Sequence, residues 1–254
     1  MKYLGVDIGS SASKAVIVDN EGVVVARWLK HTGVGVATDV IETVLAETGT
    51  EASEIACTVA TGYGRKLVPG ADEEIAELSC HAKGARALVP KTRTIIDIGG
   101  QDAKAISLDG YGRIQSFAMN DKCAAGTGRF LEVMAHVLGV GTDALPDLAA
   151  ASGTDIRISN TCTVFAESEV ISQLAGGGSK ADIAKGIHAS VAERIAGLAK
   201  RVDIVPVVCM TGGSANNSAL AACIGKELGA EIVVPEWPQM AGALGAALYA
   251  RAIL

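Results

Sequence analysis

The feature of this sequence that most constrains its fold is an internal repeat. Residues 5–15 and residues 95–105 both contain Asp-Ile-Gly followed by Lys-Ala at the same spacing. In each copy an apolar segment leads into a glycine-rich turn, a second apolar segment, a turn at 19–22 or 109–112, and a third strand-like segment. This order is typical of a three-stranded β-meander. The chain is therefore expected to form two lobes of similar topology.

Helical patterns follow each meander. Apolar residues recur every three or four positions in 38–48 and 180–200, as they do on the buried face of a helix. The patterns predict helices over 38–48, 71–88, 125–138, 163–175, 180–200, 214–228 and from about 240, with strands over 204–210 and 231–234. We therefore expect an α/β fold in which residues 1–92 and the C-terminal helix 239–254 form lobe I, and residues 93–238 form lobe II.

Charge and hydropathy limit the partners of the chain. The formal net charge of −6 argues against nucleic acid as the main partner, since phosphate binding favours a basic face, although a local basic patch is compatible with it. The N-terminus lacks the pattern of a signal peptide, and the apolar run 241–250 is too short to span a bilayer. We expect a cytoplasmic protein with no membrane partner.

Both glycine turns carry the elements of a phosphate site. Asp7 and Asp97 end their strands, and flexible backbone follows at Gly9 and Gly99. Backbone N–H groups in such turns can bind phosphate oxygens, while the carboxylate can hold Mg²⁺ through water. Two facing hairpins would hold a polyphosphate from both sides. One such turn alone could be an ordinary hairpin, but the repeat and a later strand–Gly-Gly–helix segment at 205–228 favour a nucleotide site.

This set of turns resembles the actin, hexokinase and heat-shock ATPase superfamily. The resemblance implies two ribonuclease H-like lobes that close over ATP in the cleft between them, with adenosine at the late Gly-Gly turn. It implies Mg²⁺ organisation by Asp7 and Asp97, and a catalytic role for these two residues and Gln101. Lys14 and Lys104 are implied phosphate contacts, but both lysines could equally lie on a solvated face. The implied nucleotide contacts are Gly9, Ser10, Ser11, Ser13, Lys14, Gly99, Gly100, Gln101, Asp102, Lys104, Gly212, Gly213 and Asn216.

Two of the six cysteines occur in related polar segments. Cys123 and Cys162 each precede a predicted helix, whose free N–H groups would stabilise a thiolate. Two cysteines cannot supply the four thiolates of a 4Fe–4S cluster, but a twofold dimer can. The other four cysteines lie in apolar or helical runs and are expected to be buried packing residues; the sequence contains no C-x-x-C pair.

The two cysteine segments narrow the family. Asn-Asp-Lys-Cys-Ala-Ala-Gly-Thr-Gly at 120–128 and Thr-Cys-Thr-Val-Phe-Ala-Glu-Ser-Glu at 161–169 closely resemble the activators (component A) of 2-hydroxyacyl-CoA dehydratases, among the BadF/BadG/BcrA/BcrD-type ATPases. The resemblance covers nearly the whole chain. It implies a homodimeric ATPase with one 4Fe–4S cluster bridging the subunits, reduced by a ferredoxin or flavodoxin. It further implies that ATP hydrolysis drives one low-potential electron to a cluster-containing acceptor, and that the protein is oxygen-labile.

Alternative functions remain open from sequence. The acceptor could be a double-cubane-cluster protein or a benzoyl-CoA reductase in place of a dehydratase. A sugar kinase of the same superfamily would have no use for the cysteine pair, and a nucleotide-dependent regulatory subunit would use it only for packing. The sequence does not assign the residue that activates water. It leaves three minor candidates, each of which could be an ordinary structural residue: His81 or Glu77 as a water-positioning group, the turn 61–65 beside the cleft, and Glu167 near the nucleotide.

Overall fold

The computed structural model describes residues 1–31 and 38–253 and divides into two compact units. The first unit comprises Met1–Thr92, Leu108–Ile114 and Pro235–Leu254; the second comprises Arg93–Ser107 and Gln115–Val234. The lobe limits expected from the sequence stay a prediction, and Leu254 of the expected C-terminal helix lies outside the described residues.

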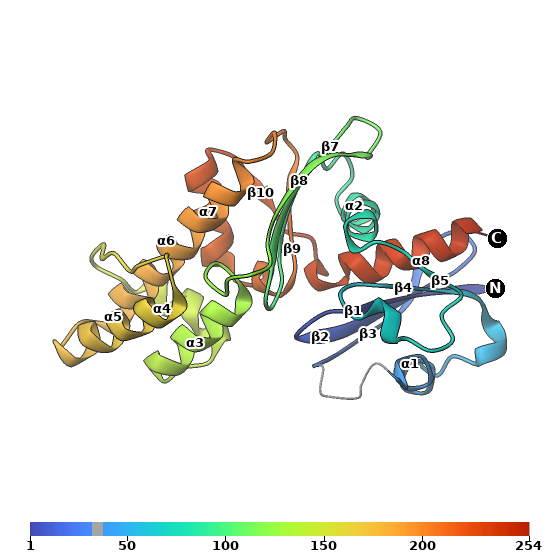
Figure 1. Cartoon of the computed structure of the whole chain (residues 1–254), viewed down its shortest axis with the longest axis horizontal. Coiled ribbons are helices and arrows are strands. Elements are labelled where there is room, and N and C mark those ends of the chain that lie inside the picture. Colours follow the sequence, from blue (N-terminus) through green and yellow to red (C-terminus); the bar gives the residue numbers. More distant parts are fainter. Residues whose placement is uncertain (32–37, 254) are drawn as a thin grey trace. The chain divides into compact units, whose positions relative to one another are not determined.

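The first unit is built on a mixed sheet with strand order β3-β2-β1-β4-β5 (Figure 1). The strands β1 (Lys2–Ile8), β2 (Ala12–Val18) and β3 (Val24–His31) form an antiparallel meander, and β4 (Ile55–Thr61) runs parallel to β1. The edge strand is β5 (Glu73–Glu74). The meander predicted for the first repeat is therefore confirmed.

Side chains of β1 alternate between two separate cores, as the two-residue period of a strand requires. Leu4 and Val6 pack with α1 (Val40–Thr48), while Tyr3 packs on the opposite side with α8 (Ala241–Ile253). The helix α2 (Glu77–Leu88) packs against α8, as Figure 1 shows. Both faces of the sheet are covered, which explains why β1 is buried almost throughout.

The second unit repeats the sheet with strand order β10-β9-β6-β7-β8. Its strands are β6 (Thr94–Ile98), β7 (Ala103–Leu108), β8 (Ile114–Asn120), β9 (Val208–Thr211) and β10 (Ile232–Val233). Pairing registers match between the copies, because Asp7 lies opposite Lys14 and Asp97 lies opposite Lys104. The repeat in the sequence is thus a repeat in the fold.

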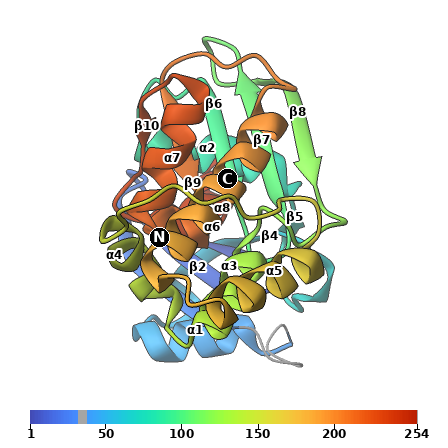
Figure 2. The same cartoon turned by 90° about the vertical axis from the view of Figure 1, so that its left-hand side faces the viewer.

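Helices form most of the rest of the second unit (Figure 2). The central helix is α6 (Lys180–Ala199), whose apolar residues are largely buried in one continuous core. Packed with it in that core are α3 (Gly128–Leu138), α4 (Leu145–Ala150), α5 (Thr163–Ala175) and α7 (Ser218–Leu228). No helix within residues 1–31 and 38–253 has the length and apolar character needed to cross a membrane.

Several predicted elements differ from the structure. Residues 71–76 are not helical, because Ile75 N–H donates to the Ala60 carbonyl and the Asp72 carboxylate accepts from Thr58 N–H, which holds this segment at the edge of the sheet. The strand predicted from residue 204 begins at Val208, after Pro206, which has no N–H to donate. The predicted helix 214–228 is interrupted: a 3₁₀ turn covers Gly213–Asn216 before α7 begins. The short helix α4 was not predicted, because six residues carry too little periodicity.

Candidate functional site

The first hairpin places a carboxylate and a lysine at one turn. Asp7 is 3% exposed, and its Oδ2 lies 3.4 Å from Lys14 Nζ on the neighbouring strand. The turn is closed by the Gly9 N–H, which donates to the Ala12 carbonyl at 3.0 Å. A Cβ at Gly9 would come within 2.8 Å of Lys14 Nζ, so the lysine ammonium lies directly against the turn backbone. The lysine thus belongs to the hairpin site and not to a distant solvated face.

The second hairpin repeats this arrangement with additional contacts. Asp97 Oδ1 accepts from Thr211 Oγ1 at 2.8 Å, and its Oδ2 lies 3.5 Å from Lys104 Nζ. Lys104 is 2% exposed and also lies 2.7 Å from Asp102 Oδ2. A buried lysine between two carboxylates is well compensated, because each charge keeps a partner of opposite sign. Asp102 therefore orients Lys104 at this turn.

The predicted nucleotide contacts differ in exposure. Ser10, Gln101, Gly213 and Asn216 are exposed and can reach a ligand directly. Ser13 is fully buried, and its Oγ has no hydrogen-bond partner in the part of the chain that the structure describes. The remaining predicted contacts, Gly9, Ser11, Lys14, Gly99, Gly100, Asp102 and Gly212, are half-buried, apart from the buried Lys104.

The Asp7 carboxylate lies against two glycines, and a histidine lies beside one of them. The sequence motifs do not connect these residues with Asp7. A Cβ at Gly62, where φ is +86°, would collide with Asp7 Oδ1. A Cβ at Gly242 would lie 2.6 Å from Asp7 Oδ2 and 3.0 Å from His81 Cε1, so the carboxylate and the imidazole flank the same glycine. His81 Nδ1 lies 3.1 Å from the Glu77 carbonyl within α2. The sequence hint of this contact is the series of small residues at 241–247, because small residues allow another backbone to approach closely.

In the second unit the Thr-Gly-Gly turn meets the second hairpin. Gly212 has φ of +87°, and a Cβ there would collide with the Ile98 backbone, so only glycine allows β9 to leave the sheet beside Asp97. The helix α3 also begins at this hairpin: Gly128 N–H donates to the Gly99 carbonyl at 2.9 Å, and Arg129 N–H donates to the Gly100 carbonyl at 2.8 Å. The predicted phosphate turn is therefore bonded directly to the helix that follows Cys123.

A buried histidine supports the turn predicted to hold adenosine. His188 is 1% exposed, and its Nδ1 lies 2.7 Å from the Ala184 carbonyl, which can only accept. Nδ1 therefore carries the proton, and Nε2 accepts from Asn217 Nδ2 at 2.9 Å. Asn217 Oδ1 in turn accepts from Leu220 N–H at 2.9 Å and caps α7. The neutral imidazole thus fixes the residue that follows Asn216.

This arrangement predicts an acid-dependent loss of stability. Burial lowers the pKa of His188, so the unfolded chain binds a proton more readily than the folded chain. The contribution is fully present above the unfolded pKa of about 6.5 and is lost as the pH falls through the lower folded value, by up to about 1.4 kcal/mol per pH unit. Urea unfolding at several pH values should show this slope in the wild type and a smaller slope in His188→Gln. The exposed His136→Gln should keep the wild-type slope; equal slopes in all three proteins would contradict the assignment.

Cys123 and Cys162 are both half-buried, and each lies in the segment that leads into a helix. Cys162 is the N-cap residue of α5, and its carbonyl accepts from Ala166 N–H at 3.0 Å. Cys123 lies in the loop between β8 and α3, where the Asn120 amide donates to the Cys123 carbonyl at 3.0 Å. Next to Cys162, the Thr163 Oγ1 is buried with no hydrogen-bond partner among the described residues.

An arginine outside the sequence motifs joins the two cysteine loops. Arg194 on α6 donates from Nε to the Ala125 carbonyl at 2.9 Å and from Nη1 to the Asn160 carbonyl at 3.1 Å. Ala125 follows Cys123 by two positions and Asn160 precedes Cys162 by two. One guanidinium therefore sets the relation between the two loops. No sequence pattern signals it, because both contacts are to backbone carbonyls far away in the chain.

Four other cysteines were expected to be buried packing residues. Cys57, Cys80 and Cys209 are buried, whereas Cys223 on α7 is only half-buried, so the prediction is wrong for that residue. Burial raises the pKa of the Cys80 thiol to about 11 and also raises the pKa of Cys57 and Cys223. These three thiols are therefore poor sources of thiolate at neutral pH.

Known proteins resemble this chain over its whole length. The 2-hydroxyisocaproyl-CoA dehydratase activator of Clostridioides difficile is 50% identical over 98% of this chain and 95% of its own. The (R)-2-hydroxyglutaryl-CoA dehydratase activating ATPase of Acidaminococcus fermentans is 50% identical over 97% of this chain and 96% of its own. A solved structure of the Clostridium difficile activator with bound ADPNP has a TM-score of 0.94 at 49% identity, covering 100% of this chain and 95% of that one.

A similar fold also occurs in proteins of much lower sequence identity. A ROK family glucokinase from Streptomyces griseus has a TM-score of 0.59 at 17% identity, covering 99% of this chain and 100% of that one. That likeness concerns the fold alone, and it confirms the expected two-lobed, actin-like α/β architecture. The model of the BadF/BadG/BcrA/BcrD ATPase family matches residues 4–250. With the duplicated hairpins and this match over nearly its full length, the chain belongs to the BadF/BadG/BcrA/BcrD ATPase family and is an ATP-hydrolysing enzyme.

Proposed function

We propose that this ATPase is a homodimeric activator of a 2-hydroxyacyl-CoA dehydratase, carrying one 4Fe–4S cluster held by Cys123 and Cys162 of each subunit. The observation that carries the proposal is the pair of half-buried cysteines in loops joined by Arg194, in a chain about half identical to named dehydratase activators. When bound, the cluster would supply a one-electron carrier of low potential, coupled to ATP hydrolysis.

The donor set fits half of such a cluster. Each chain offers two half-buried thiols, one of them at the start of α5, while a 4Fe–4S cluster takes four. The unpartnered Thr163 hydroxyl next to Cys162 is a donor available to a sulfur ligand. Val164 and Phe165 lie exposed beside Cys162, at 63% and 65%. Apolar residues of this size at the cysteine favour burial against a second copy, which would bring the two missing thiols across a twofold axis.

For the nucleotide, we assign ATP/ADP phosphates to the two hairpin turns and Mg²⁺ to the carboxylates of Asp7 and Asp97, through water. The exposed Gln101 is the candidate for contact with the terminal phosphate or the attacking water. The other assigned contacts are Gly9, Ser10, Ser11, Ser13, Lys14, Gly99, Gly100, Asp102 and Lys104 for phosphate and Gly212, Gly213 and Asn216 for adenosine. Ser13 is the weakest of these, because its side chain is enclosed.

The hydrogen bonds between the second hairpin and α3 offer a route from nucleotide to cysteine. Gly99 and Gly100 each accept from the first N–H groups of α3, and the loop before α3 carries Cys123. A change in the hairpin on ATP binding or hydrolysis would therefore act on the start of α3. Nucleotide can drive such a change only through unequal affinity for the two conformations. Electrons would come from a ferredoxin or flavodoxin and leave to the cluster-containing dehydratase, in the cytoplasm.

The test is iron and acid-labile sulfide in protein purified without oxygen. We expect about four of each per wild-type dimer, and their loss in Cys123→Ser and Cys162→Ser, because each variant removes two of the four thiolates. Cys223→Ser is the matched control, since this thiol is also half-buried, and it should keep the full content. Iron-free wild type that is dimeric, stable in air and active as an ATPase would contradict the cluster and favour a kinase. Full iron content in Cys123→Ser would contradict the ligand assignment.

A further inference from the structure

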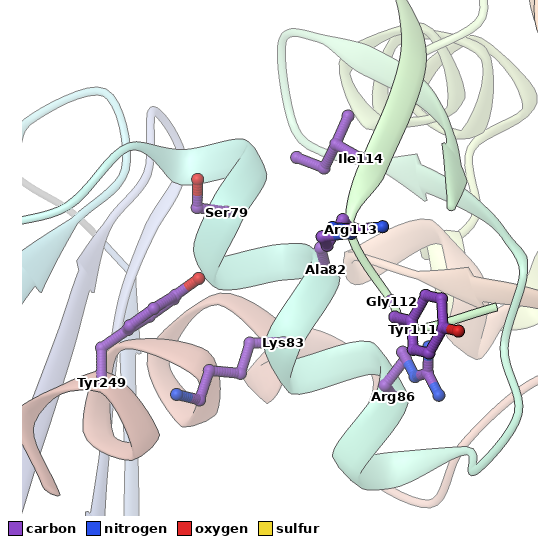
Figure 3. Close-up of a pocket in the computed structure, with 9 residues that line it drawn as sticks. All are labelled: Ser79, Ala82, Lys83, Arg86, Tyr111, Gly112, Arg113, Ile114 and Tyr249. Atoms are coloured by element: carbon purple, nitrogen blue, oxygen red, sulfur yellow. The ribbon is translucent and has the colours of Figure 1, made fainter. Parts of the chain in front are cut away.

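A pocket of about 510 Å³ lies along α2 (Figure 3), and none of its lining residues is assigned to nucleotide or cluster. Ser79, Lys83 and Arg86 line it from α2, Tyr249 from α8, and Tyr111 and Arg113 from the turn between β7 and β8. Lys83 reaches toward Tyr249 at one end of the pocket, and Arg86 reaches toward the turn at the other. The volume is in the range of small-molecule sites.

The lining is cationic in a chain with net charge −6. Three of the lining side chains are basic, and none of the described lining residues is acidic. Arg113 is paired with Asp109 at 2.7 Å, but neither Lys83 nor Arg86 forms an ion pair within the described ranges. Lys83 Nζ instead lies 4.0 Å from the centre of the Tyr249 ring, and Arg86 Nη1 donates only to the Gly110 carbonyl, at 3.4 Å. Two cations of α2, one at each end of the pocket, thus lack a counter-charge among the described residues.

Burial of the Lys83 ammonium without a counter-ion is unfavourable. Burial, together with the nearby charge of Arg251, lowers the pKa of Lys83, so the site disfavours an unpaired cation. An anion in the pocket would offset this effect, because an opposite charge favours the charged form.

The internal repeat shows that the turn between β7 and β8 does not need Tyr111 and Arg113 in order to form. In the first copy Asp19 Oδ1 accepts from Glu21 N–H at 3.0 Å and Val23 N–H at 2.9 Å. In the second copy Asp109 Oδ1 accepts from Tyr111 N–H at 2.8 Å and Arg113 N–H at 2.9 Å. The two turns are held by the same bonds.

A helix arginine contacts each turn as well. Arg251 of α8 donates to the Asn20 carbonyl in the first copy, as Arg86 of α2 donates to the Gly110 carbonyl in the second. The frame is therefore duplicated, while the acidic Glu21 and apolar Val23 are replaced by an aromatic and a basic residue in the second copy only. The second turn therefore carries an aromatic ring and a guanidinium that the first turn lacks.

We propose that this pocket binds a small organic polyphosphate, with one phosphate group at Lys83, another at Arg86, and its organic part against Tyr111 and Tyr249. A phosphate group carries the charge opposite to that of each cation, and the arginine fork matches phosphate oxygens. Tyrosine rings offer apolar surface with a polar edge for the remainder of the ligand. Its lining residues are distinct from those assigned to the cluster and to the ATP hairpins.

Inorganic pyrophosphate, titrated calorimetrically into the dimer saturated with Mg²⁺ and ADP, is the probe. We expect saturable binding in the wild type and at least about tenfold weaker binding in Lys83→Gln/Arg86→Gln, from the loss of two charge-assisted contacts. Lys200→Gln/Arg201→Gln removes the same charge from exposed positions on the second unit and should change the affinity by less than about twofold. ATPase rates should stay at the wild-type level in both double variants.

A second variant keeps the test valid if the α2 substitutions disturb folding. Tyr111→Glu/Arg113→Val gives the second turn the residues of the first turn, which folds with the same bonds, and it should also weaken pyrophosphate binding. Absence of saturable binding to the wild type at millimolar pyrophosphate would overturn the proposal. So would equal weakening in the Lys200/Arg201 control, or release of labelled ADP in step with pyrophosphate uptake, which would place the anion at the ATPase site.

Discussion

Gly245→Ala should destabilise the protein by about 3 kcal/mol, a large part of the stability of an ordinary domain. A Cβ at Gly245 would collide with the backbone carbonyl of Cys80 on α2, and backbone cannot swing aside as a flexible side chain can. The same crossing contains Gly84, whose Cβ would collide with the Ala241 carbonyl, while Gly5 brings β1 equally close to α8. The three glycines allow α2, α8 and β1 to meet at backbone contact.

The control for this prediction is another helical glycine. Gly197 on α6 has no atom within 4 Å of an added Cβ, so Gly197→Ala should raise stability by about 0.5–1 kcal/mol through the better helix propensity of alanine. Urea or thermal unfolding of the two variants beside the wild type gives both values. Because the substitutions are chemically identical, only the crossing explains opposite signs. A Gly245→Ala protein as stable as wild type would show that α2 and α8 can separate without loss.

The two hairpins could be predicted from sequence because their information is local. Asp-Ile-Gly, a lysine five positions later and alternating apolar residues specify a strand, a turn and a register within a dozen residues. The repeat then supplied a second, independent copy, and both copies show the same Asp–Lys pairing. Cys162 at the start of α5 was likewise predictable, because a helix boundary is a local signal.

The parts that could not be predicted depend on contacts between distant segments. His81 reaches the Asp7 region only because glycines allow α2 and α8 to approach, and small residues alone do not reveal their partner. The segment 71–76 has a helical composition but is drawn to the sheet edge by Thr58 and Ala60. In each case tertiary hydrogen bonds or backbone contact outweigh local propensity.

Arg194 is the strongest example of such a distant contact, and its loss should loosen the proposed cluster. Arg194→Gln removes the donors to Ala125 and Asn160, so the two cysteine loops lose their common support. Residues that orient metal ligands typically contribute 10- to 100-fold to metal affinity. We therefore expect iron to be lost to a chelator at least about tenfold faster than from the wild type, followed by the bleaching of the visible absorbance under anaerobic conditions.

Arg129→Gln is the matched control, because the side chain of this α3 arginine is 62% exposed and, among the described residues, forms an ion pair only with Glu132. Arg129→Gln should release iron at the wild-type rate. Arg194→Lys keeps the positive charge but loses the two-donor guanidinium, so it should release iron at a rate between those of the wild type and Arg194→Gln. The same variants test the loop connection without iron: in metal-free protein a thiol reagent should label Cys162 faster in Arg194→Gln than in Arg129→Gln. Faster labelling without any iron in the wild type would keep the role of Arg194 and reject the cluster. Equal labelling and equal iron release would reject Arg194 as the residue that joins the two loops.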